Sequence, residues 1–214
     1  MDAVAQVRQD YARGSLDVGD VDPHPLRQLE RWITEAFTAQ VGEPNAMTLA
    51  TVDADGRPDA RIVLLRGVTE TSLVWFTDRR SAKGTQLAGA AHAALVFYWQ
   101  PLERQVRLRG PVSALDDAAS DAYFASRPRG SQLSAWASHQ SQETPSREAY
   151  EQQVLDVEAR FEGVDDVPRP PFWGGYALSP VAVEFWQGRI SRRHDRVRFD
   201  ADGQGGWTLR RLQP

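Results

Sequence analysis

Hydrophobic and polar positions along this chain predict a strand-rich protein with inserted helices. Most of the expected strands are short apolar or alternating runs bounded by Gly, Pro, Asp or Ser. The expected strands span 46–52, 60–65, 73–77, 93–99, 105–112, 181–187, 193–199 and 206–211. Apolar residues at three- and four-residue spacing predict a helix over 25–41, and the other helices are expected at 4–12, 81–87, 116–125, 131–137 and 146–161.

This element order predicts a fold that is mainly β with peripheral helices, in the α+β class. Six or seven antiparallel strands in such a chain favour a small closed or split barrel with helices packed outside it. We expect one domain over 1–214, with a helical N-terminal segment over 1–41 and a helical insertion at about 116–162. No dinucleotide or P-loop fingerprint occurs, so a nucleotide-binding α/β sheet is not expected.

Composition narrows the function classes. Hydrophobic residues make up 41% and charged residues 25%, which is typical of a globular protein. The absence of cysteine excludes disulfides and thiolate chemistry and favours a reducing compartment; with no signal-peptide pattern, we expect a cytoplasmic location. No apolar run approaches the roughly 20 residues of a membrane span. The net charge of −4 argues against a nucleic-acid partner.

Metal and serine-hydrolase chemistry have little support in the sequence. The four histidines contain no pair at the i, i+4 spacing of a helical metal site, so no metal is expected. No G-x-S-x-G elbow is present. The two D-A-D-G segments, at 53–56 and 200–203, lack the rest of a calcium loop and are interpreted as turns.

Cations gather in three places that suit anions. Arg61 and Arg66 flank an apolar strand, and Ser81-Ala82-Lys83-Gly84 begins a helix, where backbone N–H groups, a hydroxyl and the chain's single lysine could hold a phosphate. A second group lies in Y-F-A-S-R-P-R-G-S (123–131) and a third in E-F-W-Q-G-R-I-S-R-R-H-D-R (184–196). Each alone is more typical of solvated surface charge than of an anion site. Together they predict two phosphorylated ligands, one of them planar, as a cofactor and a substrate would be.

These motifs, in this order, resemble the pyridoxamine 5′-phosphate oxidase family over 8–214. The matching segments are R-Q-D-Y (8–11), R-I-V-L-L (61–65), S-A-K-G (81–84), E-R-Q-V (103–106), Y-F-A-S-R-P-R (123–129), Q-S (140–141), W-G-G-Y (173–176), E-F-W-Q-G-R (184–189) and R-R-H-D-R (192–196). The resemblance implies an FMN-binding split β-barrel and a homodimer whose active sites use both subunits. It further implies oxidation of pyridoxamine 5′-phosphate and pyridoxine 5′-phosphate to pyridoxal 5′-phosphate by O2 in vitamin B6 salvage, with release of H2O2 and, from the amine, NH3.

The resemblance also carries over individual residues. Those implied for FMN are Arg61, Ile62, Val63, Leu64, Leu65, Arg66, Phe76, Thr77, Lys83, Gln105, Gln140, Ser141, Trp186 and Arg196. Those implied for the substrate are Arg8, Tyr11, Arg66, Tyr123, Arg127, Ser131, Arg192 and His194. Arg192 and His194 are the candidate catalytic residues, for orientation and proton handling at the reacting carbon, because histidine titrates near neutral pH.

Four positions depart from the commonest family pattern. Arg66 stands where lysine is usual, Phe76 where tyrosine is common, and Arg193 where an apolar residue is typical. Ala82 stands where arginine is frequent, and this loss predicts weaker FMN binding, by about 1.5 to 3 kcal/mol for one charge-assisted contact.

Two other functions stay open at this point. The first is a related split-barrel flavin oxidase or reductase that acts on another aromatic substrate, since one fold hosts several chemistries. The second is a non-catalytic carrier of FMN or pyridoxal phosphate. The motif containing Tyr123, Arg127 and Ser131 favours the phosphorylated B6 substrates.

Overall fold

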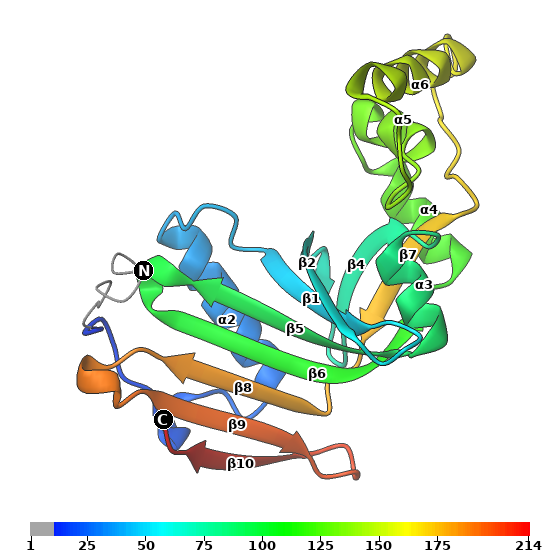
Figure 1. Cartoon of the computed structure of the whole chain (residues 1–214). Helices are drawn as coiled ribbons and strands as arrows, with labels where there is room; N and C mark the ends of the chain where they lie inside the picture. The colour runs from blue at the N-terminus through cyan, green and yellow to red at the C-terminus, as the bar shows by residue number, and fades with distance from the viewer. Residues whose placement is uncertain (1–10) are drawn as a thin grey trace.

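The computed structural model describes residues 11–214, which form a curled antiparallel sheet with helices inside its curl and at one end (Figure 1). The strands are β1 Ala46–Val52, β2 Pro58–Leu64, β3 Gly67–Val68, β4 Leu73–Asp78, β5 His92–Trp99, β6 Arg104–Ala114, β7 Trp173–Leu178, β8 Ala182–Gln187, β9 Asp195–Ala201 and β10 Trp207–Leu212. The helices are α2 Pro25–Thr38, α3 Ala82–Gly89, α4 Asp117–Ala125, α5 Arg129–Ala137 and α6 Arg147–Arg160, with 3₁₀ turns η1 Val18–Asp20, η2 Gln100–Leu102 and η3 Ile190–Arg192.

Strand β6 holds the two parts of the sheet together. The main path runs β10-β9-β8-β6-β5-β1-β2, and β4 pairs with β3 and β7 beside it. The first part of β6 pairs with β8 as far as Arg109, and its end pairs with β7 from Val112 onward. Gly110 lies at this change of partner, where a Cβ would come within 2.0 Å of the Ser179 carbonyl oxygen. A side chain at this position would clash with that carbonyl oxygen, so β6 needs a glycine here.

Helix α2 fills the inside of the curl. It begins with Pro25 at its first turn, a position where the missing N–H costs nothing. Leu26, Leu29 and Trp32 are buried at the predicted spacing, and the Trp32 ring packs edge-on against Phe185 with centroids 5.1 Å apart. Each such side chain contributes about 1.5 to 3 kcal/mol by its burial.

Helices α4, α5 and α6 stand at the far end of the sheet and enclose a second hydrophobic cluster (Figure 1). Phe124 and Trp173 meet at its centre, with ring centroids 5.2 Å apart. Asp116 and Ser146 accept hydrogen bonds from the first-turn N–H groups of α4 and α6 and so fix where these two helices begin.

The predicted α+β class, mainly β with peripheral helices, is confirmed, and three details of the prediction are wrong. The described chain has ten strands instead of six or seven, because all eight segments predicted as strands form strands and two more, the very short β3 and β7, were missed. Strand β7 carries Gly174 and Gly175 and is buried at all six positions, so it shows neither alternation nor strand-forming composition. The strand expected from Arg193 begins at Asp195, because the preceding residues form η3.

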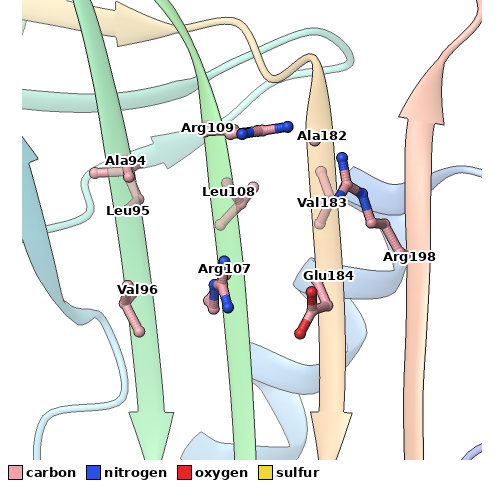
Figure 2. Close-up of a pocket in the computed structure, with 10 residues that line it drawn as sticks. All are labelled: Ala94, Leu95, Val96, Arg107, Leu108, Arg109, Ala182, Val183, Glu184 and Arg198. Carbon is pink, nitrogen blue, oxygen red and sulfur yellow. The ribbon is translucent and has the colours of Figure 1, made fainter. Parts of the chain in front are cut away.

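One face of the main sheet has no helix over it in the described part of the chain. Figure 2 shows part of this open face, where Arg107 and Arg109 of β6, Glu184 of β8 and Arg198 of β9 surround a shallow pocket above Ala94 and Val96. Toward β2 the same face becomes apolar, and Ile62 is 64% exposed. A large exposed apolar surface of this kind is typical of an interface.

Candidate functional site

The first group of predicted site residues surrounds the start of α3, and we call Arg61, Thr77, Lys83, Gln140 and Ser141 the α3 cluster. Lys83 Nζ donates to Gln140 Oε1 at 3.1 Å, and the Thr77 hydroxyl donates to the same oxygen at 3.0 Å. The Ala82 N–H donates to Ser141 Oγ at 3.1 Å. The structure therefore brings β4, α3 and the segment after α5 together, as the prediction for FMN requires.

The start of α3 depends on Ser81 and Gly84. The buried Ser81 hydroxyl donates to the Asp78 carbonyl at 2.6 Å and accepts from Lys83 Nζ at 3.3 Å and from the Gly84 N–H at 3.4 Å. A Cβ on Gly84 would lie 2.2 Å from the Arg79 carbonyl oxygen. Local sequence thus fixes the helix start tightly against the end of β4.

The α3 cluster has the charge and donors that a phosphate needs. Burial and the nearby Arg61 guanidinium lower the pKa of Lys83, while Asp78 and Asp59 partly offset them. Arg61 donates to Thr51 Oγ1 at 2.6 Å and to Gln86 Oε1 at 3.0 Å, and it pairs with Asp59. Two cations held this close, with hydroxyl and amide groups between them, fit the phosphate of a flavin mononucleotide.

Residues 62–65, which were predicted for FMN, lie at a free edge of the sheet. Residues 62–65 include the end of β2, which pairs only with β1 among the described strands. The N–H and C=O groups on its other edge are therefore available to a planar ring system. Strand β2 ends at Leu64, one residue before its predicted end, and the N–H of Arg66 beyond it donates to the Val74 carbonyl.

A second group, the arginine–aromatic cluster, consists of Arg66, Phe76, Tyr123, Arg127 and Trp173. The rings of Phe76 and Tyr123 stack with centroids 3.9 Å apart, and Trp173 stacks on Phe76 at 5.4 Å. The Arg127 guanidinium lies 4.7 Å from the Trp173 ring centroid. Its Nη1 atom is buried and has no hydrogen-bond partner within the part of the chain that the structure describes.

Electrostatics of this cluster favour an anion. Burial lowers the pKa of Arg127, and the nearby Arg66 lowers it further. An unpaired buried guanidinium N–H is costly unless a ligand accepts from it. Ser131 lies in the first turn of α5, and no hydrogen bond within 11–214 joins its hydroxyl to Arg127 or Tyr123. The structure therefore brings together Arg66, Tyr123 and Arg127, three of the four residues predicted for the substrate phosphate, and adds Phe76, which was predicted for FMN.

The third group, the β8–β9 cluster, consists of Tyr11, Trp186, Arg192 and His194. The Trp186 and His194 rings lie 4.6 Å apart, and Tyr11 packs edge-on against both at 5.8 Å. The N–H of Arg189 donates to His194 Nδ1 at 3.1 Å, which places the proton of the neutral imidazole on Nε2.

The backbone and charges around His194 are unusual. Ser191 and Arg192 have φ of 56° and 61°, a left-handed conformation that costs about 1 to 3 kcal/mol for such residues. Burial and the Arg192 guanidinium lower the pKa of His194, and Asp195 opposes them. The imidazole is therefore neutral at neutral pH and has Arg192 beside it.

Gln105 and Arg196 lie next to this cluster on the open sheet face. Both are register partners of Trp186, Gln105 from β6 and Arg196 from β9. The Arg196 guanidinium forms a two-bonded fork with the buried Glu184 carboxylate, at 3.0 Å for each bond. The role of Arg196 toward flavin stays a prediction, because most of its donors are used within the chain.

The structure does not join the α3 cluster and the β8–β9 cluster into one pocket. Arg61 lies on β2 and Trp186 on β8, four strand steps apart along the sheet, which corresponds to roughly 19 Å. Arg8, the remaining predicted residue, lies outside the described residues.

Sequence reasoning missed several residues that shape these clusters. Asp78, Arg80 and Gln86 border the α3 cluster, and Glu184 holds Arg196. Gln86 follows Lys83 by three residues on one helix, so helical spacing could have indicated it. No comparable local signal points to Glu184, whose partner lies on the next strand.

Comparison with known proteins gives consistent matches. Residues 33–161 match the family model described as pyridoxamine 5′-phosphate oxidase, and residues 173–214 match one described as the pyridoxine 5′-phosphate oxidase C-terminal dimerisation region. A pyridoxine/pyridoxamine 5′-phosphate oxidase of Ralstonia nicotianae is 54% identical, and one of Paraburkholderia phymatum 53%, each over all of both chains.

Solved structures agree with the fold. PhzG of Burkholderia lata, determined with tetrahydrophenazine-1-carboxylic acid, has a TM-score of 0.86 at 33% identity and covers 94% of this chain and 100% of its own. A pyridoxamine 5′-phosphate oxidase-related, FMN binding protein of Nostoc punctiforme has a TM-score of 0.71 at 23% identity, with 89% and 97% covered. The predicted split barrel is confirmed. Among residues 11–214, no helix combines the length and hydrophobicity needed to cross a bilayer.

Proposed function

Because the chain belongs to the pyridoxamine 5′-phosphate oxidase family, we propose that it uses FMN and O2 to oxidise pyridoxamine 5′-phosphate and pyridoxine 5′-phosphate to pyridoxal 5′-phosphate. The products would include H2O2 and, from the amine, NH3, and the reaction would serve vitamin B6 salvage. The observation that carries this proposal is the buried Arg127 guanidinium, which lies against stacked aromatic rings and keeps one donor unpaired. A phosphate attached to an aromatic ring satisfies both features.

Residues of this chain would divide the binding of cofactor and substrate. The α3 cluster would hold the FMN phosphate, the free edge of β2 and Phe76 would lie along the ring system, and Gln105, Trp186 and Arg196 would contact it from the other cluster. Arg66, Tyr123, Arg127 and Ser131 would bind the substrate phosphate. Arg8 and Tyr11 would cover the bound substrate from the N-terminal segment.

Positioning and proton handling would fall to the β8–β9 cluster. When bound, FMN supplies a hydride acceptor that O2 reoxidises. Arg192 would orient the reacting end of the substrate, and the neutral His194 would exchange a proton there through Nε2. The aromatic packing of Trp186 and Tyr11 keeps that imidazole in place.

We propose that two copies of the chain form a homodimer with shared active sites. The separation of the α3 and β8–β9 clusters within one protomer and the open sheet face both support this arrangement. Val96→Asp places a carboxylate in the middle of that face, and the expected result is a monomer by sedimentation, with Val96→Thr remaining dimeric. A dimeric Val96→Asp variant would contradict this interface.

We also propose that residues 1–214 form one domain. Strand β7 supports this, because its Tyr176 and Leu178 belong to the main core and its Trp173 belongs to the cluster under the helices. Two cores that share one strand do not form separate units.

The experiment that tests the function combines a spectrum with an assay. The purified protein, or the apoprotein supplied with FMN, is expected to show flavin absorption and to form H2O2 from pyridoxine 5′-phosphate. Flavin binding without turnover would favour a carrier. Turnover of a phosphate-free aromatic acid alone would favour a substrate more like the tetrahydrophenazine-1-carboxylic acid bound to PhzG.

A further inference from the structure

We infer that Arg80 is a third cation for the FMN phosphate in this protein, in addition to Lys83 and Arg61, at a groove beside the α3 cluster. This inference rests on the proposed FMN site and adds a residue that the family resemblance does not supply. The groove lies between the β1–β2 turn, the exposed side of α3 and the segment after α5. Its lining includes Arg80, Ala82, Gln86, Gln140 and Ser141.

Arg80 lines the same groove as two residues of the α3 cluster. Gln140, which accepts from Lys83 and Thr77, and Ser141, which accepts from the Ala82 N–H, both line the groove. The groove therefore continues the donor set that already includes Lys83 and the first N–H groups of α3.

Arg80 is held rigid before any ligand binds. Its Nε and Nη2 donate to the two Asp78 carboxylate oxygens at 3.2 and 2.9 Å, and its guanidinium lies 3.3 Å from the Phe172 ring centroid. Asp78 is buried and also accepts from the Arg80 N–H. A side chain fixed in this way loses little rotamer freedom when it binds an anion.

One guanidinium nitrogen of Arg80, Nη1, is left for a ligand. No hydrogen bond in the described part of the chain uses Nη1, and the side chain is 39% exposed. Ala82, two residues along, has only a methyl group and leaves room beside the helix start. Arg80, in the turn before α3, thus supplies the positive charge that the family's frequent arginine would carry at position 82.

The test compares FMN with riboflavin, which has the same ring system and no phosphate. Binding to the apoprotein is followed by quenching of flavin fluorescence. Arg80→Gln keeps an amide that can bond to Asp78, and it is expected to weaken FMN binding about 10-fold while riboflavin binding changes less than twofold. Arg57→Ala removes an exposed cation at the β1–β2 turn and serves as the matched control, with both affinities unchanged.

A second variant makes the test specific for charge at the groove. Ala82→Arg in the Arg80→Gln background is expected to restore FMN affinity to within about threefold of the parent protein. Ala82→Arg alone is expected to raise the FMN affinity of the parent protein by less than about threefold. Equal losses of FMN and riboflavin affinity in Arg80→Gln would show a structural role and overturn the inference. So would unchanged FMN affinity. If the parent apoprotein binds neither flavin, the proposed function fails together with this inference.

Discussion

The α3 cluster and the β8–β9 cluster are built in opposite ways. The α3 cluster joins residues far apart in the chain, since Gln140 lies 57 positions after Lys83 and 63 after Thr77. The β8–β9 cluster takes three of its four residues from 186–194, which covers the end of β8 and its connection to β9. The first therefore depends on the whole fold, and the second on local backbone geometry with Tyr11 packed against it.

Mutations in the two clusters should therefore impair different properties of the protein. Changes in the α3 cluster should alter cofactor affinity, and changes at Arg192 and His194 of the β8–β9 cluster should alter the rate while cofactor affinity persists. A variant that lowers cofactor affinity and reaction rate equally would weaken this distinction between the two clusters.

The largest expected effect is on the rate. His194→Ala and Arg192→Ala should each lower kcat/KM for pyridoxine 5′-phosphate by about 100-fold or more, the usual scale for loss of a positioned acid–base group. FMN affinity should stay within twofold. Arg193→Ala removes a neighbouring exposed cation and is the control, with little change expected. Rates within a factor of two for both cluster variants would make the assignment wrong.

The next effect is on the cofactor. Lys83→Met should weaken FMN binding by about 10- to 100-fold, because a charge-assisted contact in a half-buried site is lost. Riboflavin affinity and the His194 titration should not change. Titration of the apoprotein with both flavins measures this, and an equal loss for both would mean that Lys83 supports the fold instead of the phosphate.

A smaller effect concerns the backbone under the α3 cluster. Gly84→Ala forces a methyl group against the Arg79 carbonyl and should destabilise the protein by about 1 to 3 kcal/mol. Gly89→Ala, in the same helix, meets no atom within 4 Å and should be neutral or slightly stabilising. Thermal unfolding of the two variants gives the comparison, and similar melting temperatures would contradict the close packing at Gly84.

The smallest effect is a titration. Burial and Arg192 hold the pKa of His194 below its ordinary 6.5, so protonation begins only at a more acidic pH than for a free imidazole. Arg192→Ala removes one cause and should raise this pKa, whereas loss of the Asp195 charge would lower it. NMR titration of the His194 ring measures the shift. A pKa that falls in Arg192→Ala would contradict the proximity of the two side chains.

The sequence predicted the elements that carry periodic signals. Helix α2 follows from the spacing of Leu26, Leu29 and Trp32, and α3 follows from Ser81 and the residues after it. Strand β7 could not be predicted this way, because a strand buried on both faces with two glycines has no alternation.

Only part of the candidate site could be predicted from the sequence. Local motifs showed that Lys83, Arg127 and His194 lie in cationic segments, and the family resemblance supplied their roles. The contact of Lys83 with Gln140 and the fork between Glu184 and Arg196 depend on how distant strands and loops meet. No local sequence pattern predicts these contacts, because residues on different strands are brought together by the register of the sheet.

The free edge of β2 has a consequence for handling the protein without its cofactor. Exposed N–H and C=O groups on an edge strand, next to the exposed Ile62, can pair with a strand of another molecule and begin aggregation. Pro58 and Asp59 at the start of β2 oppose such pairing, because proline lacks a donor and the carboxylate repels a second copy. Flavin bound along this edge would therefore act as a solubilising cap, and apoprotein should precipitate at concentrations that the loaded protein tolerates.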